Sequence, residues 1–315
     1  MSQSKPHQSK FQAAMLLKKN IHNKVKQILL TKRKPVRYIF LISPLNSGTT
    51  VASQYIAEKI DNCFLPSDGN NEGLRIPEVW SSINQKERWN PSIPINYKVA
   101  KEIWPRLAIE NQCNTFLEAS PPNLCHVQQI DSDFKNPFFI FWMSNPYLHI
   151  GSCVNRYALK EKVFNFNHAI RRATRRWIKL ALIQQKNLSL FPKSPYITYE
   201  SFCSNPEKAL TPIQELKLEM NQNIPKISGK SNTKITEIVN MTPKYIAFLG
   251  IKGLQLIQRE LSDYSDLMNS FNYEIYTTKT ANLAVNSNIL LASEGIQEKI
   301  KWLQTSNKLA QNETN

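Results

Sequence analysis

The sequence predicts an α/β fold in which helices flank an open parallel sheet, built as a single large domain over residues 36–280. Four short apolar runs predict strands, at residues 37–42, 115–118, 137–143 and 195–198. Stretches with helical spacing separate these runs, as in a sheet whose parallel strands are joined by helices. Polar turns that contain proline follow the runs. Ligands bind at that edge of such sheets, so we expect the functional residues there.

The composition is that of an ordinary globular protein, with 41% hydrophobic and 20% charged residues among 315. We expect no transmembrane helix, since no uninterrupted run of about 18 apolar residues is present. The N-terminus also lacks the apolar core of a secretory signal. The five cysteines are scattered without metal-binding spacing, which indicates reduced thiols rather than a disulfide framework or a zinc site. We therefore expect a cytoplasmic protein that holds no metal.

Positive charge is concentrated at the N-terminus. The net charge is +16, and residues 1–37 hold ten Lys or Arg, whereas the first acidic residue is Glu58. We expect residues 1–35 to form a basic arm with an amphipathic helix over residues 11–30. The arm is either solvated or in weak contact with an anionic membrane surface, which would make the protein peripheral to that membrane. The arm lacks interleaved aromatic residues, so we expect no specific nucleic-acid partner.

The most informative segment follows the first strand. The chain breaks from the strand at Ser43-Pro44, passes through a polar turn, and takes up helical spacing from Val51 onward. Such a strand, turn and helix start form a P-loop-like cradle for an anion, because unpaired backbone N–H groups and the positive end of the helix dipole meet there. No Lys follows the glycine, which argues against a nucleotide kinase. The cradle residues are Asn46, Ser47, Gly48, Thr49 and Thr50.

The turn Ser47-Gly48-Thr49-Thr50 resembles the 5'-phosphosulfate loop of sulfotransferases that use 3'-phosphoadenosine 5'-phosphosulfate (PAPS). Further segments, in the order of that family, resemble its other motifs, and the resemblance to bacterial and carbohydrate-type members covers residues 36–275. These segments are residues 72–79 (Glu-Gly-x-x-Leu-Pro-x-Val type), 116–123 (Leu-Glu-Lys-Ser-Pro type), 139–146 with Ser152 (Arg-Asn-Pro-x5-Ser type), 196–207 (Tyr-Glu-Asp-Leu type) and 268–273 (Leu-x-x-Phe-Gly-Tyr type).

The resemblance implies transfer of a sulfuryl group from PAPS, with 3'-phosphoadenosine 5'-phosphate (PAP) as product. The acceptor would be a hydroxyl or amine of a carbohydrate or of another small or lipid-linked molecule. It implies that the amides of residues 46–50 hold the 5'-phosphate and that Ser144 and Ser152 lie at the 3'-phosphate. Lys230 falls where the family has a basic cofactor loop. The sequence does not indicate which acceptor is used or how many copies assemble.

The transfer also requires a base that takes a proton from the acceptor. Two glutamates are candidates, because members of the family use a Glu at either place: Glu118, in the segment that resembles Leu-Glu-Lys-Ser-Pro, and Glu72, in the Glu-Gly segment. Glu118 could instead be a structural carboxylate bonded to loop amides, and Glu72 a solvated loop acid. The sequence leaves both assignments open.

The chain departs from the family pattern at three cationic positions, which hold Asn46, Ala119 and Ser144. Each lost charge-assisted contact is worth about 1.5–3 kcal/mol in a sheltered site. Either other cations compensate, or the chain is a catalytically altered or inactive sulfotransferase-fold protein that binds an anionic glycan or nucleotide. The candidate cations are Arg75, Arg156, Lys226 and Lys230.

Two later segments are amphipathic. Residues 171–176, Arg-Arg-Ala-Thr-Arg-Arg, precede Trp177 on a predicted helix. We expect Trp177 in the core and the arginines on a solvated face, with one or two of them within reach of an anionic acceptor. Residues 281–315 are expected to form a helix over residues 290–303 and a polar tail.

Overall fold

The computed structural model describes residues 35–67, 71–160, 165–214, 227–228, 234–235 and 238–276. Most of the predicted basic arm, the predicted C-terminal helix, and Lys226 and Lys230 lie outside these ranges. Within them, all five cysteines are unpaired. None of the described helices combines the length and the apolar character that crossing a bilayer requires.

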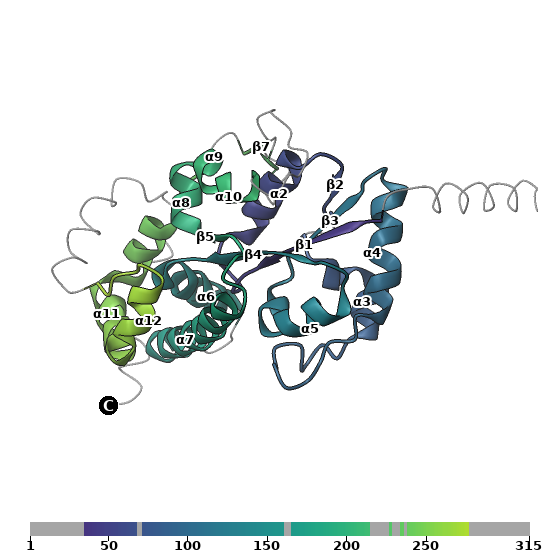
Figure 1. The fold of residues 1–315 in the computed structure, drawn as a ribbon. Coiled ribbons are helices and arrows are strands. Elements are labelled where there is room, and N and C mark those ends of the chain that lie inside the picture. Colours follow the sequence, from purple (N-terminus) through teal and green to yellow (C-terminus); the bar gives the residue numbers. More distant parts are fainter. Residues whose placement is uncertain are drawn as a thin grey trace, which may run out of the picture.

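Five parallel strands form the central sheet in the order β2-β3-β1-β4-β5 (Figure 1). The predicted fold class is confirmed, and the four predicted strands are present. The strand of this sheet that the sequence does not predict, β2, has only two residues, too few to show a pattern. The bounds are β1 Arg37–Ile42, β2 Cys63–Phe64, β3 Thr115–Glu118, β4 Phe138–Met143 and β5 Tyr196–Thr198.

Both faces of the sheet are apolar, because successive side chains of β1 alternate between them. Ile39 and Leu41 pack on one face, and Phe40 and Ile42 pack on the other. The first face is covered by α2 (Thr49–Lys59), α8 (Tyr199–Ser204), α9 (Pro206–Ala209) and α10 (Thr211–Gln214). The second face is covered by α3 (Pro77–Ser82), α4 (Lys98–Glu110), α5 (Val127–Asp133) and α7 (Phe166–Leu190).

A further core lies where α7 packs against α6 (Pro146–Lys160), α11 (Thr242–Leu261) and α12 (Ser265–Ser270). Trp177 is fully buried there, as predicted, and its Nε1 donates to the carbonyl of Ser144 at 3.3 Å. The remaining elements are the short helices η1 (Gly73–Arg75), η2 (Pro121–Cys125) and η3 (Ser262–Tyr264), and an antiparallel pair, β6 (Ile227–Ser228) with β7 (Lys234–Ile235).

The strand order determines where a ligand can enter. The chain passes from β1 to β2 at one edge of the sheet, returns to β3, and then crosses to β4 on the other side of β1. The connections after β1 and β3 therefore leave on opposite faces and open a crevice at the carboxyl ends of the central strands. The residues that directly follow β1, β3, β4 and β5 all meet at this edge.

Candidate active site

A cavity of about 480 Å³ opens at the carboxyl edge of the sheet. It is bounded by the loop after β1, the start of α2, the segment around η1, one face of α6 and the segment before α11. The residues that line it are Leu45, Asn46, Gly48, Thr49, Thr50, Val51, Glu72, Arg75, Pro121, Leu148, Ser152, Arg156, Tyr199, Ile238, Val239, Met241 and Tyr245.

The loop that enters α2 depends on glycine at position 48. Gly48 has φ 80° and ends the loop directly before the first residue of α2. A Cβ at this position would collide with the ring of Tyr199, so the left-handed conformation and the close packing both require glycine. No side chain caps the first turn of α2. This turn lies on the cavity wall, and its unsatisfied N–H groups make the wall suited to an anion.

Ser47 does not line the cavity. Its side chain is buried, and its Oγ donates to the carbonyl of Pro44 at 2.6 Å. Its own carbonyl accepts from Nε1 of Trp142 at 2.8 Å. Ser47 therefore ties the loop to its own start and to β4, while Asn46, Gly48, Thr49 and Thr50 form the exposed part of the cradle.

A buried cysteine and histidine of α6 hold the same loop from behind. Asn46 Nδ2 donates to Cys153 Sγ at 3.0 Å, Cys153 Sγ lies 3.6 Å from His149 Nε2, and His149 Nδ1 lies 2.8 Å from the carbonyl of Leu45. Both ends of this chain of contacts therefore reach consecutive loop residues. Burial alone raises the pKa of Cys153, but His149, Asn46 and Arg176 together lower it to about 7.

One face of α6 contributes Leu148, Ser152 and Arg156, which are spaced four residues apart and so lie along the cavity in a row. Ser144, the other position expected at the 3'-phosphate, is fully buried, has no partner for its hydroxyl among the described residues, and lies outside the lining. Ala119 is likewise buried.

Arg75 and Arg156 are accordingly the cationic side chains on the described cavity wall. They are two of the four cations that the sequence offers as compensation for the missing family positions. Lys230 lies outside the described residues. The structure therefore places two guanidiniums on the cavity wall, although positions 46, 119 and 144 carry none.

Glu72 is held at the mouth of the cradle by its neighbours. Asn71 Nδ2 donates to the carbonyl of Thr50 and to Ser53 Oγ, both at 3.0 Å, so the residue before Glu72 is bonded to α2. The Glu72 side chain is 18% exposed and lines the cavity, and its Oε2 pairs with Arg75 Nε at 2.7 Å. A carboxylate thus faces the cavity next to the anion cradle.

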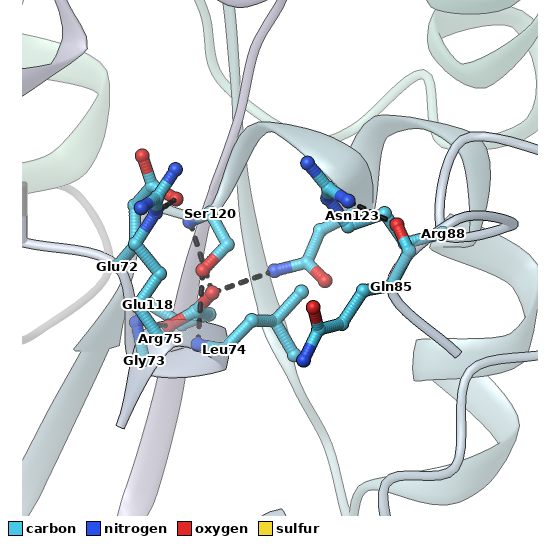
Figure 2. A network of polar contacts seen from close by, with 9 residues as sticks. All are labelled: Glu72, Gly73, Leu74, Arg75, Gln85, Arg88, Glu118, Ser120 and Asn123. Carbon is cyan, nitrogen blue, oxygen red and sulfur yellow. Dashed lines mark hydrogen bonds and ion pairs between the residues drawn. The ribbon is translucent and has the colours of Figure 1, made fainter. Parts of the chain in front are cut away.

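Glu118, the other candidate base, is completely buried and lies outside the lining. Figure 2 shows its side chain with those of Ser120 and Asn123 and with Gly73. Its Oε2 accepts from the N–H of Gly73 at 2.6 Å, and its Oε1 accepts from Ser120 N and Asn123 Nδ2, both at 2.9 Å. Burial raises the pKa of Glu118 to about 7, against the opposing effect of these donors. The arrangement is that of a carboxylate that ties the segment around η1 to the end of β3.

Tyr199 forms part of the cavity wall. Its ring packs on Gly48, and its hydroxyl donates to the carbonyl of Val239 at 3.1 Å and accepts from Met241 N at 3.0 Å. The residues between Ile238 and Tyr245 that complete this wall carry no sequence signal that marks them as site residues.

Among the described residues, no three His, Cys, Asp or Glu side chains are grouped so that they could together hold a metal ion. The chemistry available in the cavity is therefore that of backbone amides, hydroxyl groups, two guanidiniums and one carboxylate.

Comparison with known proteins gives matches among solved structures alone. No family model matches the chain, and no curated protein matches its sequence. Several of the solved structures that it resembles are sulfotransferases or sulfotransferase domains. They include a sulfotransferase domain from the curacin biosynthetic pathway (15% identity, TM-score 0.46, covering 78% of this chain and 100% of that one). Another is the sulfotransferase domain of the Synechococcus PCC 7002 olefin synthase (15% identity, TM-score 0.45, covering 78% of this chain and 98% of that one). A third is a sulfotransferase from Mycobacterium avium (11% identity, TM-score 0.44, covering 81% of this chain and 82% of that one). At these values we draw no conclusion about activity from the likeness.

Proposed function

We propose that the chain is a sulfotransferase that moves a sulfuryl group from PAPS to a hydroxyl or amine of a carbohydrate or of another small or lipid-linked acceptor. The observation that carries the proposal is the composition of one cavity. The uncapped start of α2, the Ser152–Arg156 face of α6 and the carboxylate of Glu72 all line it. The sequence segments that resemble sulfotransferase motifs supply much of that lining.

The fit to PAPS rests on the two anionic ends of the nucleotide. The amides of residues 48–50, with the Thr49 and Thr50 hydroxyls, would hold the 5'-phosphate at the positive end of the α2 dipole. Ser152 Oγ and the guanidinium of Arg156 would hold the 3'-phosphate. When bound, PAPS supplies the activated sulfuryl group, and PAP is the leaving group. Donors that stabilise charge on the leaving phosphate lower the barrier, by about 2.7–4 kcal/mol for one well-placed donor.

We assign the base to Glu72. As the acceptor oxygen forms its bond to sulfur and the bond from sulfur to the 5'-phosphate oxygen breaks, Glu72 takes the acceptor's proton. Arg75 orients the Glu72 carboxylate through their ion pair. Glu118 supports this arrangement from behind, because it holds the N–H of Gly73, the residue next to Glu72.

A second candidate function has an observation in its favour. Three positions where sulfotransferases carry a cation hold Asn46, Ala119 and Ser144, and the Asn46 amide is engaged with Cys153. A protein of this fold that binds an anionic glycan or nucleotide without transferring sulfate would tolerate those changes. Binding and transfer therefore have to be measured separately.

Calorimetry with PAP tests the proposal first. We expect micromolar binding that is lost or strongly weakened in Thr49→Ala and Ser152→Ala. Ser132→Ala, which removes an exposed hydroxyl from α5, is the matched control and should bind normally. Transfer of radiolabelled sulfate from PAPS to a panel of acceptors tests the second step. PAP binding without transfer would favour the second candidate function, and magnesium-dependent binding of ATP in place of PAP would contradict the proposal.

A further inference from the structure

Three arginines from separate parts of the chain lie over Trp80 and Trp89, and Arg88 interacts electrostatically with the other two and with Glu72. Arg75 ends η1, Arg88 lies between α3 and α4, and Arg176 lies on α7. The guanidinium carbons of Arg75 and Arg88 lie 5.6 and 5.1 Å from the centre of the Trp80 ring. The cluster therefore includes one residue of the cavity wall, Arg75, and Arg88, which contacts the same Trp80 ring. Figure 2 shows Arg75 and Arg88 in this region.

Tryptophans hold the guanidiniums in place. The guanidiniums of Arg75 and Arg88 both lie over the Trp80 ring. Arg176 lies over Trp89, with its guanidinium carbon 5.3 Å from the ring centre. Each such contact stabilises a cation by about 0.5–2 kcal/mol and restricts its side chain before any ligand arrives. Stacking on a ring explains the position of each arginine by itself. It does not explain why three positive charges lie close to one another.

The positive charge of the cluster is incompletely balanced. Glu72 pairs with Arg75, and in the described ranges no carboxylate forms an ion pair with Arg88 or Arg176. Arg88 uses one nitrogen to donate to the carbonyl of Gln85. Burial lowers the pKa of Arg88, and the charges of Arg75 and Arg176 lower it further while Glu72 raises it. These groups therefore act on one another electrostatically, with three cations against one carboxylate.

We propose that Arg75, Arg88 and Arg176 form a subsite for an oxyanion group of the acceptor, so that the preferred acceptors are acidic molecules carrying a carboxylate, sulfate or phosphate close to the reacting hydroxyl. The inference rests on the proposed function, since it places the acceptor between Glu72 and the cluster. A guanidinium that is already held over an aromatic ring binds an oxyanion in a planar, bidentate fashion at little further cost in side-chain entropy. The anion would offset the repulsion within the cluster and leave the acceptor hydroxyl near Glu72.

Two probes that differ in a single carboxylate test the subsite. In calorimetry on the full chain saturated with PAP, 4-nitrophenyl β-D-glucuronide should bind about tenfold more tightly than 4-nitrophenyl β-D-glucoside, or better. The preference should be lost in Arg88→Met and Arg176→Met. It should persist in Arg106→Met, which removes an exposed cation of α4 outside the cluster, and in part in Arg88→Lys, which keeps the charge. PAP should bind all four variants as it binds the wild type.

Two further measurements are made on the wild type, so that they do not depend on whether a variant folds. One of them also does not depend on PAP binding. The preference of the wild type for the glucuronide should shrink as salt is raised, because part of it is Coulombic. The titrations are repeated without PAP, so failure of PAP to bind counts against the proposed function and leaves the anion preference measurable. Equal affinity for the two probes, binding of neither, or a preference that survives both arginine-to-methionine changes would overturn the subsite.

Discussion

The N–H of Gly73 donates to Oε2 of Glu118 across 2.6 Å, and this bond separates the roles of the two glutamates that the sequence offers as bases. A Cβ on Gly73 would collide with the same oxygen, so the backbone approaches the carboxylate as closely as it can. The bond places Glu118 behind the segment and leaves the side chain of Glu72, one residue earlier, on the cavity.

The two glutamates should respond differently to the same substitution. Glu72→Gln should lower the rate of sulfate transfer by about 10²–10⁴-fold, the usual contribution of a general base, with PAP binding unchanged. Glu118→Gln should instead destabilise the fold. Its amide NH₂ would face N–H groups that now donate hydrogen bonds to the carboxylate. Each buried donor left unsatisfied costs about 1–3 kcal/mol.

Transfer kinetics and denaturant unfolding of both variants check this pair. Unfolding is measured above pH of about 7, the pKa of Glu118, so that the wild-type carboxylate is ionised. A Glu118→Gln protein of unchanged stability that has lost transfer, beside a fully active Glu72→Gln, would reverse the assignment.

Arg156 should contribute to nucleotide binding. It lines the cavity one helical turn after Ser152, where a 3'-phosphate would lie. Arg156→Met should weaken PAP binding by about 1.5–3 kcal/mol, the value of a charge-assisted contact in a sheltered site. Arg106→Met removes the same charge from the exposed surface of α4 and should have no effect. Calorimetry with PAP on both variants decides between a local contact and a general effect of net charge, which would weaken both alike.

Gly48→Ala should disrupt the cradle. The substitution places a Cβ against the ring of Tyr199 at a backbone φ of 80° that L residues rarely adopt. We expect PAP binding to fall below detection and the midpoint of thermal unfolding to decrease, since strain of this kind costs about 1–3 kcal/mol. Gly250→Ala is the matched control, because Gly250 has φ 61° but open space around its Cα. It should lose stability and keep PAP affinity; equal loss of PAP binding in both variants would contradict the role given to the cradle.

Cys153 should be the first thiol of the chain to ionise. Its pKa is lowered to about 7, whereas burial raises the pKa of Cys63 to about 12, of Cys125 and Cys203 to about 11, and also that of Cys113. Thiolate absorbance in the ultraviolet should therefore rise by one equivalent around pH 7 and be absent from Cys153→Ser. His149→Ala, which removes the main group that lowers the pKa, should shift this step upward.

The sign of the accompanying stability change follows from the same shift. A folded-state pKa below the ordinary value of 9 means that the thiolate stabilises the fold once it has formed. The free energy of unfolding of the wild type relative to Cys153→Ser should thus grow as pH rises from about 7 to 9. This contribution of the thiolate should be lost as pH falls through 7. If the difference in free energy of unfolding between the two proteins does not change with pH, the Cys153 thiolate does not stabilise the fold.

The fold was predictable because the strands are short, apolar on both faces and followed by polar turns, so that 37–42 and 115–118 coincide with β1 and β3. The cradle was predictable for a similar reason, since a strand, a turn with Gly48 and a helix start are consecutive in the sequence. Local patterns of this kind report on local structure.

The division of roles within the site could not be predicted, because it depends on contacts between distant residues. Nothing near Glu118 in sequence indicates that Gly73, 45 residues earlier, will enclose it. The same holds for Arg176, because nothing near it in sequence indicates that its guanidinium will lie over Trp89. Tertiary packing determines which of several similar side chains faces the cavity.

The central claim is that the cavity at the start of α2 holds the two phosphate ends of an adenosine nucleotide, and a crystal structure of the chain with PAP tests it most directly. We predict that the 5'-phosphate accepts hydrogen bonds from the amides of residues 48–50 and that the 3'-phosphate contacts Ser152 and Arg156. PAP bound at another place, or bound in this cavity with neither phosphate at these groups, would contradict the account.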